Sequence, residues 1–304
     1  MPTASFPITP PYNFELSLKF SRRSRFEIVD NTARGHLCRI LKINSNSVFF
    51  DIWGDGTIEN PQGRVSWVAL DRKSINRSEA IAVARWILFA NLDLNPFYQR
   101  GKKSKPVGAL IDKFRGLKPI LTPTLFEAAA WAIMGQQVNL DFASVLKKRL
   151  VEKFGKSFSH KWDNYFQFPQ PEDLLGANVG MLQKMQFSTR KAEYIIGLAQ
   201  VLKDGQLQKS RLAEMNYADA IEALQSIRGI GLWSSNYILM RGVGHLNCLP
   251  LGDSGLNRAI RQLYRLDSKP DNRTVEKLAE PFTPYRSLFT LYLWFSLIEG
   301  KENS

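Results

Sequence analysis

The sequence predicts an α+β protein, with a small antiparallel β-sheet domain at the N-terminus and a mainly α-helical region after it. Within residues 1–75, short segments alternate apolar and polar residues, which is the period of a half-buried strand. From residue 78 onward, apolar residues recur with the helical period and strand-like segments nearly vanish. A chain of 304 residues can also bury two cores. We therefore expect a strand-rich domain over 1–90 that ends in a helix, and an all-α region over 91–304.

The N-terminal domain is expected to contain four strands followed by one helix. The strand-like segments are 14–20, 37–43, 47–53 and 63–70. Polar and glycine-rich residues at 44–47 and 54–56 predict the turns between them. The apolar pattern over 79–89 then predicts a helix.

The second region is expected to be a succession of helices. Thr124 should cap a helix over 126–134, with Glu127 as its capping-box partner. Basic residues at 102–105 predict an exposed loop, and the nearly all-apolar last helix should be buried. The remaining predicted helices cover residues 142–154, 169–176, 189–203, 217–224, 256–266 and 285–298.

Charge and cysteine content narrow the classes of partner and cofactor. Lys and Arg total 41 against 28 Asp and Glu, a net charge of +13 that favours a polyanionic partner. Cys38 and Cys248 are too few for a disulfide framework or a cysteine-held zinc or iron–sulfur site. The three histidines show no metal-ligand spacing, so no side-chain metal site is expected. Without signal-peptide or membrane-spanning features, a cytoplasmic monomer is expected, nucleoid-associated if bacterial and with no membrane partner.

A glycine hairpin between two apolar helical segments is the first candidate site. Its backbone amides could approach a phosphate closely, and the start of the following helix would favour the negative charge. A plain tight turn remains the alternative. The residues expected to contact DNA here are Arg228, Gly229, Ile230, Gly231 and Ser234.

Asp253 is the second candidate. It stands before Ser-Gly-Leu, where it would cap the next helix, and a carboxylate held in this way suits an electrostatic stabiliser or a general base. A lysine beside the hairpin could attack a sugar as a Schiff-base nucleophile, but the sequence has Trp233 there. The carboxylate is therefore expected to work with water.

Aromatic residues could form a pocket for an electron-poor base, although each of them alone is more often part of core packing. The expected pocket residues are Trp131, Trp233, Tyr237, Ser254 and Tyr285.

Gln136 and Gln137 lie at an interruption between two apolar helices. Their side chains could fill the gap that a flipped base leaves in the duplex, or simply make a polar loop.

Together these residues resemble the helix-hairpin-helix (HhH-GPD) DNA glycosylases, most closely the alkyladenine branch typified by bacterial 3-methyladenine-DNA glycosylase II (AlkA-like). The hairpin and Asp253 are the centre of the match. Residues 90–300 match well and the strand-rich part only loosely. The supporting segments are 92–98, 126–138, 189–199 and 284–294.

The resemblance implies a role for individual residues. Asp253 falls on the catalytic aspartate, and Trp233 falls where bifunctional members carry a lysine, which implies base excision without strand cleavage. Tyr237 and Tyr285 fall on pocket aromatics. Gln137 falls on the wedge position, where the best-known member has an apolar residue. A structural monovalent cation is expected on hairpin carbonyls near Ile227 and Ile230, and no other cofactor.

The expected function is that of a monofunctional DNA glycosylase of base excision repair. It would flip alkylated purines such as 3-methyladenine and 7-methylguanine out of duplex DNA and hydrolyse their N-glycosidic bond. Asp253 would stabilise the oxocarbenium ion and orient the attacking water. The alternatives are a related enzyme for 8-oxoguanine, hypoxanthine or uracil, and a non-catalytic DNA-binding protein that uses the hairpin as a clamp.

Overall fold

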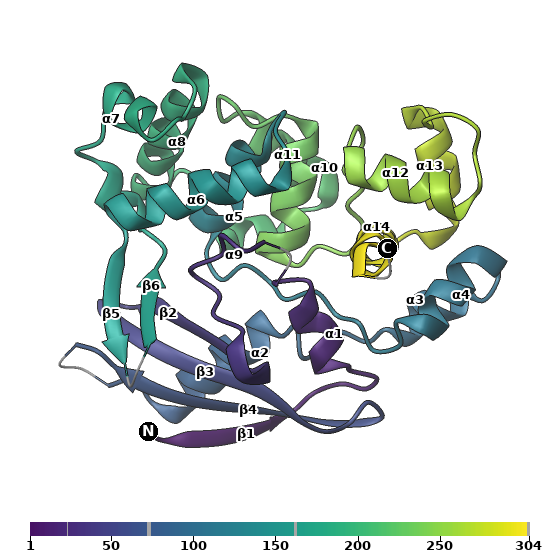
Figure 1. The fold of residues 1–304 in the computed structure, drawn as a ribbon, viewed down its shortest axis with the longest axis horizontal. Coiled ribbons are helices and arrows are strands. Elements are labelled where there is room, and N and C mark those ends of the chain that lie inside the picture. Colours follow the sequence, from purple (N-terminus) through teal and green to yellow (C-terminus); the bar gives the residue numbers. More distant parts are fainter. Residues whose placement is uncertain (23, 72–73, 161–162, 303–304) are drawn as a thin grey trace.

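A six-stranded sheet lies along the lower edge of the molecule and most helices lie above it (Figure 1). The computed structural model describes residues 1–22, 24–71, 74–160 and 163–302. The predicted α+β class is confirmed, because a largely antiparallel N-terminal sheet precedes a mainly helical region. Across the described ranges, each helix is too short or too polar to span a membrane.

Four strands of the sheet come from the N-terminal part of the chain. They are β1 (Thr3–Pro7), β2 (Leu37–Ile43), β3 (Asn46–Thr57) and β4 (Asn60–Ala69). The turn predicted at 54–56 is wrong, because Gly54 pairs with Gly63 inside a long β3–β4 hairpin. The reversal occurs two residues later, beyond Thr57, so the glycines belong to the strand.

The strand predicted over 14–20 is also wrong, because this segment forms helix α1 (Phe14–Lys19). Asn13 caps the helix: its Oδ1 accepts a hydrogen bond from the Leu16 amide at 3.0 Å. The alternating pattern could not show that Leu18 packs into the core as part of a helix. This difference matters for the cleft described below, because Lys19 at the end of α1 and Arg22 after it both line that cleft.

The region after residue 90 is not all-α, because it contributes a hairpin to the sheet. This hairpin consists of β5 (Lys156–His160) and β6 (Asp163–Gln167), and β6 pairs with β2 in parallel through Ile40 and Gln167. Tyr165 packs its ring against Phe49, with 4.7 Å between the ring centroids. The two regions therefore share one sheet.

The predicted helices occur with ends that differ by four residues or fewer, except that residues 169–176 form only a single 3-10 turn. The residues at 102–104 form the turn between α3 and α4, and Lys105 already belongs to α4. The short helices α3, α4, α7, α9 and α13 were not predicted. The helices are α2 (Arg77–Ile87), α3 (Asn95–Gly101), α4 (Lys105–Lys113), α5 (Leu125–Gly135), α6 (Leu140–Phe154), α7 (Val179–Lys184), α8 (Thr189–Lys203), α9 (Lys209–Glu214), α10 (Tyr217–Gln225), α11 (Leu232–Ile238), α12 (Ser254–Leu263), α13 (Asn272–Ala279) and α14 (Arg286–Glu302), with single turns at η1 (Ala33–Gly35), η2 (Pro171–Leu174), η3 (Leu239–Val243) and η4 (Glu280–Phe282).

Helix α5 lies at the centre of the helical layer and is buried on nearly all sides. Its run of alanines lets neighbouring helices approach closely, and a Cβ added at Gly242 would lie 2.7 Å from the Cβ of Ala128. Thr124 caps the helix as predicted, accepting from the Glu127 amide at 3.1 Å. The predicted capping box is not completed, because the Glu127 carboxylate pairs with Arg39 on β2.

Candidate active site

Three N–H donors from three different helices hold the carboxylate of Asp253. As predicted, Asp253 caps α12, and its Oδ1 accepts from the Leu256 amide at 2.6 Å. Oδ1 also accepts from Trp294 Nε1 on α14 at 2.9 Å, and Oδ2 accepts from Trp233 Nε1 on α11 at 3.0 Å. Gly252 has a φ of +80°, which allows the tight loop before the cap. Both oxygens are thus fixed in position.

The carboxylate lies at the wall of a cleft of about 600 Å³. Trp131, Trp233, Tyr237 and Ser254 all line this cleft, so four of the five predicted pocket residues come together. The rings of Trp233 and Tyr237 are stacked with 5.6 Å between centroids. The cleft can therefore offer aromatic faces to a planar, electron-poor group.

Tyr285, the fifth predicted pocket residue, lies apart from the other four. It does not line the cleft, and its ring centroid lies 5.9 Å from the Arg100 guanidinium carbon. Trp294, which was not predicted, lines the cleft from α14, whereas Tyr285 stands just before the first residue of that helix. An indole N–H in an otherwise apolar helix needs an acceptor, and that signal could have identified Trp294.

The predicted hairpin leads into α11 and requires glycine at its first position. Gly229 has a φ of +94°, and a Cβ there would lie 2.3 Å from Cγ of Tyr194. Gly231 faces open space and precedes α11 without a side-chain cap. Arg228 is exposed and pairs with Glu193 at 2.7 Å. The first amides of α11 therefore have no side-chain cap, and an anion could accept their hydrogen bonds.

The side chains of Gln136 and Ser234 hold the hairpin in place and do not point outward. Gln136 Nε2 donates to the Gly229 carbonyl at 2.8 Å and to Ser234 Oγ at 3.0 Å. Ser234 is 2% exposed, because its hydroxyl faces the end of α5. Gln137 is different: it is exposed, has a φ of +55°, and lies beside residues that line the cleft.

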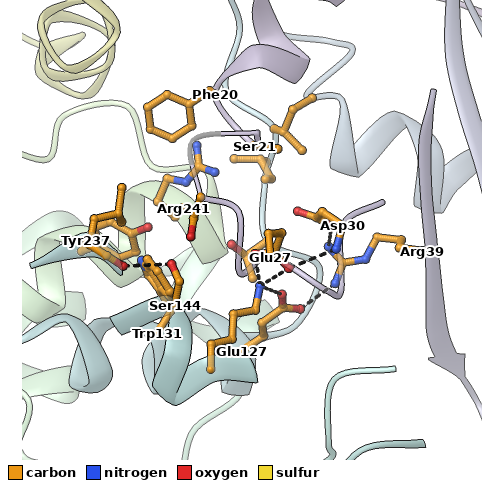
Figure 2. Close-up of a pocket in the computed structure, with 16 residues that line it drawn as sticks. Phe20, Ser21, Glu27, Asp30, Arg39, Glu127, Trp131, Ser144, Tyr237 and Arg241 are labelled. Carbon is orange, nitrogen blue, oxygen red and sulfur yellow. Dashed lines mark hydrogen bonds and ion pairs between the residues drawn. The ribbon is translucent and has the colours of Figure 1, made fainter. Parts of the chain in front are cut away.

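A second, smaller chamber of about 60 Å³ lies behind Trp131 and Tyr237 and holds an ion-pair network (Figure 2). Arg39 on β2 pairs with Asp30 at 2.6 Å and with Glu127 on α5 at 2.7 Å. Lys147 on α6 pairs with Glu27 at 2.8 Å and with Glu127 at 3.5 Å.

The ion pairs offset part of the cost of burying these charged groups, although Arg39 Nε has no hydrogen-bond partner among the described residues. Burial opposes ionisation of Glu27, but the Lys147 ammonium and two backbone amides outweigh it and keep the pKa of Glu27 below its usual value. Lys147 Nζ also lies 5.9 Å from the ring centroid of Trp131. The network thus joins the N-terminal sheet to the helices that carry one wall of the cleft, and its role is structural. Among the described residues, no cluster of side chains could hold a metal ion.

Comparison with known proteins identifies relatives of the whole arrangement. The model of the HhH-GPD superfamily base excision DNA repair proteins matches residues 130–284. The chain is 38% identical to a DNA-3-methyladenine glycosylase of Bacillus subtilis, covering 66% of this chain and 67% of that protein. It is 30% identical to a putative DNA-3-methyladenine glycosylase of the same organism, covering 95% and 97%. A 3-methyladenine DNA-glycosylase structure from Archaeoglobus fulgidus superposes with a TM-score of 0.82 at 25% identity, covering 96% and 97%.

Proposed function

The chain belongs to the HhH-GPD superfamily of base excision DNA repair proteins, and from this premise we propose that it is a monofunctional DNA glycosylase for alkylated purines. It would act as a monomer on duplex DNA and release bases such as 3-methyladenine and 7-methylguanine. The observation that carries the proposal is the Asp253 carboxylate, fixed by two indole N–H groups and one amide in an aromatic cleft. Relatives named for 3-methyladenine support the substrate class.

Alkylation gives the proposed leaving group its reactivity. A purine alkylated at a ring nitrogen carries positive charge, so the faces of Trp233 and Tyr237 would attract it. The C1′–N bond breaks and its electron pair leaves with the base, which needs no strong general acid. The sugar is left as an oxocarbenium ion, and water then adds to C1′.

Asp253 would stabilise that cation and receive the proton of the attacking water. A carboxylate offers about four lone-pair sites. The Leu256 amide and Trp294 occupy two on Oδ1, and Trp233 occupies one on Oδ2. The remaining site is on Oδ2, so this oxygen would face the sugar and the water. Electrostatic stabilisation by a fixed group of this kind is often the largest catalytic contribution.

The hairpin and its neighbours would hold the DNA while the base is flipped. The open amides at the start of α11 suit a backbone phosphate, which positions the duplex without reading its sequence. Exposed Gln137 would fill the space left by the flipped base.

A monovalent cation on the hairpin carbonyls is a further part of the proposal. The Ile227 carbonyl accepts from the Ile230 amide at 3.0 Å and the Gly229 carbonyl accepts from Gln136. Each carbonyl keeps a second lone pair, and uncharged oxygens suit a hard cation. The ion would stiffen the turn and take no part in bond cleavage, for which no other cofactor is required.

Strand cleavage is not expected, because no free amine lies beside Asp253 among the described residues that line the cleft. Trp233 occupies the position next to the hairpin and donates its N–H to the carboxylate. Lys19 lines the cleft, but its ammonium pairs with Glu299 on α14 at 2.6 Å. The chemistry would therefore end at an abasic site.

Base-release chromatography tests the proposal. Purified protein is incubated with methylated DNA and with duplexes that each carry one 8-oxoguanine, hypoxanthine or uracil. Release of 3-methyladenine and 7-methylguanine is expected, and a denaturing gel should show intact strands until hot alkali is added. Release of an oxidised or deaminated base alone would refute the substrate class, and binding without any release would refute catalysis.

A further inference from the structure

Exposed Arg and Lys side chains lie on α12 beside the cleft and on the turn between α3 and α4. Arg258 lines the cleft, one helical turn beyond Ser254 on α12, and Arg261 follows it. Three lysines crowd the turn between α3 and α4. We define the basic ridge as Arg258, Arg261, Lys102, Lys103 and Lys105, all of them exposed.

The two halves of the basic ridge are physically connected. The Ser104 side chain lies close to that of Tyr264, the residue that ends α12. Helix α12 also packs on α14, and α14 packs on α4. In Figure 1, α3, α4 and α12 accordingly lie at the same end of the molecule. Arg258 and Tyr264 are six residues apart, so the ridge extends at least about 9 Å from the cleft to the turn between α3 and α4.

The positive charges of the basic ridge are not neutralised by neighbouring carboxylates among the described residues. In the described part of the chain, none of its five cations has a carboxylate within 4.0 Å, whereas Lys19 and Arg228 near the same cleft are both paired. Arg261 donates only to the backbone carbonyls of Leu266 and Asp267. Neighbouring like charges repel one another, and a polyanion would remove that repulsion.

We propose that the basic ridge is a second DNA-backbone contact, separate from the glycine hairpin, which binds the duplex on one side of the damaged nucleotide. The inference rests on the proposed function, because it uses the cleft as the place where the damaged nucleotide lies. Phosphates follow one another every ~3.4 Å of helix axis along one strand, so a ridge of about 9 Å reaches two or three nucleotides beyond the lesion. Such a contact positions the duplex without reading its sequence.

The experiment compares two triple variants that remove the same charge. The ridge variant is Lys102→Ala, Lys103→Ala and Lys105→Ala. The control removes three exposed lysines from β2, the end of α6 and β5: Lys42→Ala, Lys153→Ala and Lys156→Ala. Fluorescence anisotropy measures the affinity of each protein for undamaged and abasic-site duplexes between about 50 and 200 mM salt.

Each lost phosphate contact lowers the slope of log affinity against log salt by about 0.9. The ridge variant should therefore lose about 2 to 3 from the slope, and the control should keep the wild-type slope. Two mirror-image duplexes, with the long flank on one side or the other of an abasic site, add a directional readout. The ridge variant should weaken binding to one of them and leave the other unchanged.

Equal slopes for the ridge variant and wild type, an equal loss in the control variant, or an equal effect on both mirror-image duplexes would overturn the inference. Wild-type base release from methylated DNA is measured in parallel. Its absence would refute the proposed function, while the slopes on undamaged duplex would still decide whether the ridge binds DNA. Base release together with an unchanged slope would refute the ridge alone.

Discussion

Replacing Trp294 by phenylalanine tests how much of the activity depends on a fixed carboxylate. The substitution removes the N–H that donates to Asp253 Oδ1 at 2.9 Å. It retains an aromatic ring that can still stack on Phe20, whose centroid lies 6.4 Å from that of the indole. The Leu256 amide and Trp233 keep their hydrogen bonds to the carboxylate. The variant should therefore fold normally and lose one constraint on Asp253.

The size of the effect follows from the hydrogen bond that is lost. A hydrogen bond to a charged group is worth about 1.5–3 kcal/mol, and about 1.36 kcal/mol corresponds to a tenfold change in rate. Full loss would slow base release by about 10- to 150-fold. Because two donors remain on Asp253, we expect the lower part of that range, about 10- to 30-fold.

The assay is single-turnover release of methylated purines, with protein in excess over damaged DNA. Trp86→Phe is the matched control, because it removes an indole N–H that has no acceptor among the described residues. The control should keep the wild-type rate. If Trp294→Phe also kept that rate, with an unchanged melting temperature, the hydrogen bond would not matter for catalysis.

Three further predictions concern the scaffold around the site. Arg39→Met should lower the free energy of unfolding by about 3–5 kcal/mol in denaturant titrations, because it leaves two buried carboxylates without their guanidinium; a loss below about 1 kcal/mol would show that the network does not hold the regions together. Gly229→Ala should weaken duplex binding in anisotropy, since its Cβ would lie 2.3 Å from the Tyr194 ring, whereas Gly176→Ala, in open space, should not; equal affinities would contradict the anchoring role of the hairpin. Burial lowers the pKa of Lys118 to about 7, far below the value of about 10.4 in the unfolded chain, so the unfolded chain binds more protons between these values. The free energy of unfolding should then rise between pH of about 7 and 9, and less steeply in Lys118→Met; identical slopes would contradict the buried position of this ammonium.

Local signals predicted the elements that carry their own start and stop residues. Helix α8 begins and ends at the predicted residues, and its cap at Ser188 is visible in the sequence. The α1 segment misled the prediction, because six residues with alternating polarity suit a strand as well as a helix. The β5–β6 hairpin gave no usable signal. Its place in the sheet depends on Ile40 and Phe49, which lie more than one hundred residues away.

In the candidate site, too, local patterns could be predicted from the sequence and tertiary contacts could not. Asp253 could be found because a cap before Ser-Gly-Leu is a local pattern, and its role as N-cap is confirmed. Tyr285 lies just before α14 and against Arg100, and this position depends on tertiary packing. The same holds for Gln136, whose amide turns inward to Gly229. Partners of this kind are set by tertiary packing and cannot be read from spacing alone.

The central claim is that the Asp253 carboxylate drives base release, and Asp253→Asn tests it most directly. Asparagine caps helices as well as aspartate does, so the fold and the affinity for abasic-site DNA should be retained. Removing the charge should slow single-turnover release of 3-methyladenine and 7-methylguanine by at least about 100-fold. Release at close to the wild-type rate by a folded, DNA-binding Asp253→Asn protein would contradict the account.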